Sequence, residues 1–215
     1  DVAQTALHTI DKLHTSMIPQ AVAINVTRNY GETAKDKANE LLEHMLIATI
    51  SVVVLIAVFL GKRAAAVVSL AVPVTLALTL FISYFLGYTL NRVTLFALIF
   101  SIGILVDDAI VVVENVERIM AEERLSPLDA TKKAMSQIQG AVVGITVVLV
   151  SVFIPMAFFT GTTGNIYRQF SLVMAVSIVF SAFLALSLTP ALCATLLKPV
   201  DEDHHVKKGF FGKFF

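Results

Sequence analysis

Two adjacent aspartates, Asp107 and Asp108, lie inside the apolar run GILVDDAIVVVEN, from Gly103 to Asn115. A charged aspartate at the centre of a membrane helix costs about 2.5–3.5 kcal/mol, so a function or a partner must offset two of them. Loss of hydration and mutual repulsion favour the protonated form, and such a pair titrates as a coupled unit. The chemistry predicted for this pair is a proton relay. The alternative interpretation is a static buried ion pair.

Further polar residues stand in register with the aspartates. Two sets repeat at intervals of seven residues: Thr94, Ser101, Asp108 and Asn115 in one, and Asp107 and Glu114 in the other. Seven residues is close to two helical turns, so each set falls on nearly one helix face. We therefore predict a helix with a narrow polar stripe that faces other helices or a water-filled path. Gly103 beside the stripe is expected to let a neighbour come close.

Composition places this helix in a membrane. Hydrophobic residues make up 57% of the 215-residue chain and charged residues only 15%. Crossing a bilayer takes about 20 apolar residues in a helix. Five stretches qualify, at 41–60, 64–86, 91–120, 138–159 and 170–197. The predicted fold class is an all-α bundle of transmembrane helices within residues 33–199. Gly140 and Gly144 form a GxxxG pair that favours close helix packing.

The basic residues predict how the chain is oriented. Loops on one side carry most of them: Lys62, Arg63, Arg118, Arg124, Lys132 and Lys133. Short loops rich in lysine and arginine stay in the cytoplasm, so the N-terminus is expected outside and the C-terminus inside. Because the outside segment follows no signal peptide, we expect the sequence to be a piece of a longer protein.

The two ends of the chain lie outside the predicted spans. Within residues 1–32, Ala3 to Met17 follow helical spacing, and Val22 to Val26 alternate as a strand should. We expect these two elements to complete a larger α/β domain outside the membrane. Residues 200–215 mix lysines with phenylalanines and are predicted to form an amphipathic tail on the cytoplasmic membrane surface.

Several kinds of chemistry have no support in the sequence. No Ser/His/Asp arrangement, CxxC motif or basic nucleic-acid face is present, so we predict no enzyme, no cofactor and no nucleic-acid partner. The run Asp201 to His205 is interpreted as a solvated loop and not as a metal site. The apolar part of the third span is Val93–Val113. Neither this part nor any of the other four spans contains a lysine or arginine. The cation that compensates the aspartates is therefore expected from outside this chain.

Long motifs carry a resemblance to a known family. The segment from Ser101 to Glu123 resembles the fourth-helix motif of resistance–nodulation–division (RND) efflux pumps of the hydrophobe and amphiphile branch. The segments from Ser136 to Ser171 and from Leu188 to Pro199 are similar to the blocks that follow it. The resemblance implies the end of a periplasmic porter subdomain, followed by the second to sixth of twelve helices. It also implies that Asp107 and Asp108 match the paired aspartates of the proton relay, with a lysine partner on a helix absent here.

The same resemblance implies a biological setting. It implies a homotrimer in the lipid of the bacterial inner membrane, with a periplasmic adaptor and an outer-membrane channel. Such a pump exchanges protons for amphiphilic compounds and uses the proton-motive force. The heavy-metal branch, which typically has alanine at the position of Asp108, is a lower alternative. A truncated chain that does not transport, and at most contacts intact pumps, is the alternative from another class.

Overall fold

The computed structural model describes residues 2–17, 19 and 22–198. All regular secondary structure in the described residues is helical, and these residues contain no strand. Its elements are α1 (Val2–Ser16), α2 (Tyr30–Phe59), α3 (Lys62–Phe85), α4 (Arg92–Glu123), α5 (Pro127–Phe153), the 3-10 turn η1 (Pro155–Phe158), α6 (Gly161–Leu186) and α7 (Leu188–Leu196). Five units are long and apolar enough to cross a membrane: α2, α3, α4, α5 with η1, and α6 with α7. The prediction of a five-span helical bundle is confirmed.

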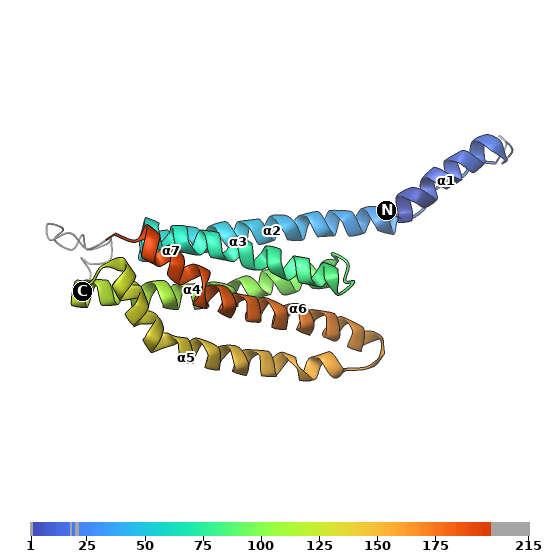
Figure 1. Cartoon of the computed structure of the whole chain (residues 1–215). Coiled ribbons are helices and arrows are strands. Elements are labelled where there is room, and N and C mark those ends of the chain that lie inside the picture. Colours follow the sequence, from blue (N-terminus) through green and yellow to red (C-terminus); the bar gives the residue numbers. More distant parts are fainter. Residues whose placement is uncertain (1, 18, 20–21, 199–215) are drawn as a thin grey trace, which may run out of the picture.

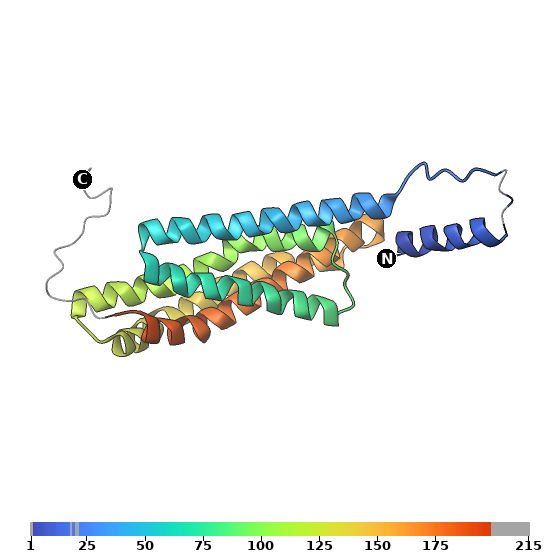
Figure 2. The ribbon, with the colours of Figure 1, turned by 90° about the horizontal axis from the view of Figure 1, so that it is seen from above.

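The helices from α2 to α7 lie side by side in one elongated bundle, and α1 extends beyond one end of it (Figures 1 and 2). Helix α4 is central, since it packs against α2, α3, α5, α6 and α7. Its most extensive partner is α6, and the two helices run parallel because one full helix, α5, returns the chain between them. The core comes mainly from α3, α4 and α6.

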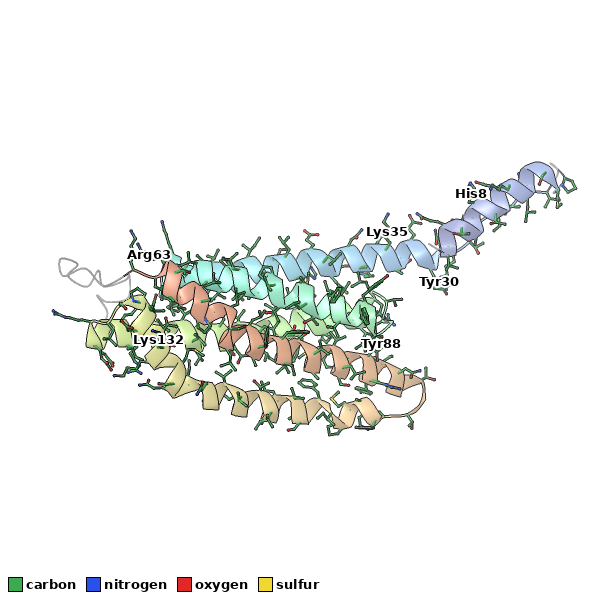
Figure 3. The ribbon with its side chains drawn as sticks, in the orientation of Figure 1. His8, Tyr30, Lys35, Arg63, Tyr88 and Lys132 are labelled. Atoms are coloured by element: carbon green, nitrogen blue, oxygen red, sulfur yellow. The ribbon has the colours of Figure 1, made fainter. Side chains whose placement is uncertain are left out.

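Charge distinguishes the two ends of the bundle. Arg63 and Lys132 lie at one end, which we call the basic end, and Tyr88 lies at the opposite end, which we call the distal end (Figure 3). Helix α4 runs from the distal end, where Arg92 begins it, to the basic end. The distribution of charge matches the loop asymmetry read from the sequence.

The N-terminal segment is only partly as predicted. The helix is present as α1, but the expected strand at Val22 to Val26 is wrong, because these residues form no ladder in the described chain. A strand requires a neighbour for its backbone N–H and C=O groups, and the described residues provide none. The expected α/β remnant is therefore not supported. Ala3 of α1 approaches α2 so closely that a Cβ added to Gly31 would clash with the Ala3 Cβ.

Two of the connections follow from capping chemistry. After α3, Gly87 has φ +77 and its N–H donates to the Tyr84 carbonyl, while the Tyr88 N–H donates to the Ser83 carbonyl. This is a Schellman motif, which glycine allows because it tolerates positive φ. Before α5, the Ser126 hydroxyl accepts from the Asp129 N–H at 3.2 Å, with proline at the first helical position. Both connections therefore follow from the residues of the turn itself.

Proline shapes the last two spans more strongly than expected. Helix α5 ends at Phe153 and continues only as the 3-10 turn that begins at Pro155. The predicted fifth span is two helices, because α6 ends at Leu186, four residues before Pro190. A proline has no N–H for the carbonyl four residues earlier and its ring clashes with it, so the break falls there. The predicted tail at 200–215, including Asp201 to His205, lies outside the described residues.

Candidate functional site

The Asp108 carboxylate faces the interface between α4 and α6. Asp108 is half-buried, and Ser181 of α6 donates its hydroxyl to Asp108 Oδ2 at 2.7 Å. The same hydroxyl lies 3.1 Å from the Leu105 carbonyl oxygen, one turn earlier on α4. Ser181 is itself buried, so this contact is shielded from solvent. The arrangement fixes one carboxylate oxygen between the two most closely packed helices.

Asp107 lies on a different face of α4. Its side chain is exposed, as are those of Phe96, Phe100 and Val111, which follow the same side of the helix. We call this set of four residues the uncovered face. Consecutive residues on a helix are about 100° apart, so neighbouring aspartates cannot share one contact surface. The structure therefore separates the pair into one packed and one open carboxylate.

The distal end of the polar stripe forms a small network. Gln169 of α6 donates through Nε2 to the Thr94 hydroxyl at 2.8 Å, and Asn91 Nδ2 donates to Gln169 Oε1 at 3.2 Å. Asn91 also caps α4, because its side-chain oxygen accepts from the Val93 and Thr94 N–H groups. The stripe is thus joined to α6 at its distal end as well as at Asp108.

The basic end of the stripe turns toward α5 instead. Asn115 Nδ2 lies 3.4 Å from the Ala134 carbonyl oxygen, and Arg118 donates to Asn115 Oδ1 at 2.7 Å and to Gln137 Oε1 at 3.3 Å. Glu114 is exposed. The stripe therefore changes partner along its length, from α6 to α5.

The middle of the stripe is buried and sparsely bonded. Ser101 has no solvent exposure and donates to the Leu98 carbonyl of its own helix at 2.8 Å. On α6, Ser177 is also fully buried, and its Oγ has no hydrogen-bond partner among the described residues. Thr189 Oγ1 on α7 is also buried without a hydrogen-bond partner among the described residues. Buried hydroxyls without partners are rare in folded proteins and require an explanation.

No described cation pairs with either aspartate. Ion pairs lie on exposed surfaces, between Lys37 and Glu40, between Arg118 and Glu122, and between Lys133 and Glu123. Within residues 2–17, 19 and 22–198, no lysine or arginine lies within 4.0 Å of an Asp107 or Asp108 oxygen. A static ion pair within this part of the chain is therefore excluded.

The glycines singled out for packing are open in this structure. A Cβ added at Gly103, Gly140 or Gly144 would meet no described atom within 4 Å. All three positions are exposed, so no described helix approaches them. Close helix approach at these glycines stays a prediction about a partner.

Sequence reasoning missed the residues on α6 that meet the stripe. Ser181 and Gln169 bind Asp108 and Thr94, yet neither stands out in an apolar span. A signal was available in the spacing, since Ser177 and Ser181 are one helical turn apart and form a short polar stripe of their own. Only the packing of α6 against α4 shows what that second stripe contacts.

Comparison with known proteins gives concordant results. The model of the AcrB/AcrD/AcrF family matches residues 1–215. The chain is 53% identical over 178 residues to the multidrug export protein AcrF of Escherichia coli K12, covering 82% of this chain and 17% of that protein. It is 45% identical over 199 residues to the toluene efflux pump membrane transporter TtgE of Pseudomonas putida, covering 92% of this chain and 19% of that protein.

A third relative gives the same match. The multidrug resistance protein MdtF of Escherichia coli K12 is 49% identical over 176 residues, covering 81% of this chain and 17% of that protein. The chain thus spans less than a fifth of the length of the curated relatives it matches.

Proposed function

Because the chain belongs to the AcrB/AcrD/AcrF family of RND efflux transporters, we propose that it supplies the proton-relay carboxylates of a proton-driven antiporter. Asp107 and Asp108 are the relay residues in this proposal. The observation that carries it is the separation of the pair, with Asp108 bonded to Ser181 and Asp107 open on the uncovered face. Ionisable residues at this depth of a membrane helix mark proton and ion pathways by default.

The geometry supports a change of helix packing with protonation. When Asp108 is ionised, the Ser181 hydroxyl satisfies only one of its two oxygens among the described residues. The other oxygen needs a cation or water, and a proton replaces this need for positive charge with a need for one hydrogen-bond acceptor. Loading and releasing a proton therefore changes what α4 must contact. One elementary charge crossing 100 mV is worth about 2.3 kcal/mol, enough to bias such packing.

The compensating cation comes from outside this chain in the proposal. On the uncovered face of α4, Asp107 lies between the exposed side chains of Phe100 and Val111. A partner helix packed on this face would contact Asp107. A lysine or arginine on that partner would reach Asp107 directly, and Gly103 would allow it close. This is also why the chain by itself is not expected to transport.

Substrate and setting follow from the relatives. The relatives are named for multidrug export, multidrug resistance and toluene efflux, which favours amphiphilic or apolar small molecules as the exported class. We place the protein in the bacterial inner membrane, with the basic end in the cytoplasm and the distal end in the periplasm. The complete transporter is proposed to be a homotrimer with a periplasmic adaptor and an outer-membrane channel.

The test is dye efflux from proteoliposomes under an imposed pH gradient. Asp108→Asn in the complete transporter should lower gradient-driven efflux by about 100-fold, because an amide cannot carry the proton. Glu122→Gln makes the same chemical change at the exposed, basic end of α4 and should leave efflux within about twofold. Retained pH-driven efflux with Asp108→Asn in a folded protein would refute the relay.

The alternative is that the chain acts without transporting. The absence of a described cation near the aspartates favours it for the isolated 215-residue chain. The same assay distinguishes the two, since the chain alone should give no efflux while the complete transporter does. Efflux by the chain alone would show that the missing cation is not required.

A further inference from the structure

A groove runs along the outside of the bundle where α5 lies against α6 and α7. It consists of two adjoining hollows that share Met135 and Gln139. One hollow, of about 480 Å³, begins at the basic end and lies between the start of α5 and α7. The other, of about 410 Å³, continues beside Gly140 and Val143 toward Leu186 of α6. We call the two hollows together the α5–α7 groove.

Small residues keep this groove open. On α7 its wall is formed by Pro190, Ala191 and Ala194. On α5, Gly140 is exposed, and a Cβ added there would meet no described atom within 4 Å. Ligand sites are concave and mostly apolar with a few placed polar groups, so the lining of the groove indicates what it binds.

The lining changes from cationic to polar to apolar along α5. Lys132, Ser136, Gln139 and Val143 are spaced by three or four residues, so they follow one face of the helix. At about 1.5 Å per residue, the polar part from Lys132 to Gln139 is about 10 Å long. The Gln139 amide has no hydrogen-bond partner among the described residues. Beyond Gln139, the side chains of Val143 and Leu186 are apolar.

The cation at the head of the groove is available to a ligand. Lys132 is exposed at the basic end (Figure 3), and it has no ion pair within the described ranges. The adjacent Lys133, in contrast, donates to Glu123 Oε1 at 2.7 Å. Asp129 is the only carboxylate in α5, and its Oδ2 accepts from the Ser126 hydroxyl at 2.6 Å. An anion at Lys132 would therefore meet a cation that is not already paired.

The order of these groups matches the order of groups in a phospholipid of the cytoplasmic leaflet. The headgroup region takes up about 5–8 Å on each side of a hydrocarbon core about 30 Å thick. A phosphate would meet the lysine, the glycerol and ester oxygens would meet hydroxyl and amide groups, and an acyl chain would meet the apolar part. Cytoplasmic leaflets carry anionic lipids, and basic pockets between membrane helices on that side bind their headgroups.

We propose that the α5–α7 groove binds an anionic phospholipid of the cytoplasmic leaflet. The Lys132 ammonium binds its phosphate, Ser136 and Gln139 contact the glycerol and ester oxygens, and an acyl chain lies over Gly140 toward Val143. A free phosphate ion would use only the head of the groove, and an uncharged helix would leave the lysine unmatched. The inference rests on the proposed placement of the basic end in the cytoplasm and not on the proton relay.

The test is photocrosslinking in the complete transporter, reconstituted in nanodiscs. The probe is phosphatidylglycerol with a diazirine in one acyl chain, and phosphatidylcholine with the same chain is the probe without net charge. Mass spectrometry locates the crosslinked residues. Lys132→Gln removes the cation of the groove, and Lys133→Gln makes the same change at the neighbouring, paired lysine. Gly140→Leu fills the apolar part, and Ala141→Leu adds the same side chain outside the groove lining.

We expect phosphatidylglycerol to crosslink to the groove about fivefold more than phosphatidylcholine, the preference that one lysine near an anionic lipid contributes. Lys132→Gln should remove this preference, and Lys133→Gln should keep it within about twofold. Gly140→Leu should lower the yield with both lipids about tenfold by excluding the chain, while Ala141→Leu leaves it unchanged. All four positions are exposed, so each variant should fold.

Four results would overturn the inference. A preference that is absent in the parent, or that survives Lys132→Gln, would contradict the headgroup contact. A yield unaffected by Gly140→Leu would place the chain outside the groove. Competition by inorganic phosphate would assign the lysine to a free anion. Groove residues that crosslink to neither lipid would show that a helix covers Gly140. Failure of the relay test with Asp108→Asn would change none of these yields, so the two proposals fail separately.

Discussion

The two sides of α4 differ although the sequence gives them adjacent aspartates. On the packed side, Asp108 bonds to Ser181 and the helix is buried against α6. On the uncovered face, Asp107 is exposed and has no described partner, while the rings of Phe96 and Phe100 on the same side reach only Phe170 of α6 and stay about half exposed. Identical side chains one residue apart therefore have different chemistry, because a helix turns by about 100° per residue. The difference teaches that a paired carboxylate motif contains two separate sites.

The largest expected effect is on chemical access to the two sides. In detergent, Asp107→Cys should react with a water-soluble maleimide about tenfold faster than Asp108→Cys, because reaction needs an accessible thiolate. Cys193 is fully buried and serves as an internal slow reference. Equal rates would remove the distinction between the sides. Protection of Asp107→Cys in the complete transporter would show that a partner helix covers the uncovered face.

The next effect is on stability from the packed side. Ser181→Ala removes the bond to Asp108 and should lower the free energy of unfolding by about 1 kcal/mol in a detergent titration. Val111→Ala on the uncovered face should change it by less than about 0.5 kcal/mol, since that side chain is 45% exposed. A loss from Val111→Ala as large as that from Ser181→Ala would contradict the assignment of the two sides.

The distal network should contribute less. Thr94→Val removes the hydroxyl that accepts from Gln169 and should cost about 0.6 kcal/mol, the average for hydrogen bonds between membrane helices. The measurement is the same unfolding titration, with Gln169→Ala and the double variant completing a mutant cycle. A coupling energy near zero would mean that the distal end does not hold the α4–α6 register.

The smallest effect belongs to the exposed ion pairs at the basic end. Lys133→Ala breaks the pair with Glu123, in which both side chains are substantially exposed. Such pairs contribute about 0–1 kcal/mol and weaken with salt. The free energy of unfolding should therefore be nearly the same for this variant and the parent. The measurement is made with and without 0.5 M salt, a concentration at which screening is strong. A larger loss would assign the basic end a role in holding the bundle.

Some of this protein could be predicted from its residues alone. Apolar length predicted the number of spans, because the burial of apolar residues along a membrane helix is a local rule. Seven-residue spacing predicted the polar stripe on α4. The strand at Val22 to Val26 failed because alternation is a necessary pattern only, and a strand also needs a partner to pair with. Pro190 indicates the break at Leu186, but the predicted span at 170–197 treats the residues on both sides of the break as one apolar run.

Tertiary packing decided what the stripe contacts. Spacing places Asp108 on a face but does not say which helix meets it, since that depends on how the apolar surfaces of α4 and α6 pack side by side. Ser177 and Ser181 look like minor polar residues in an apolar span, and only the parallel register brings one to Asp108 and leaves the other without a partner. Sequence determined the elements and their chemistry through local rules, whereas the pairing of those elements arose from non-local burial, which no single segment encodes.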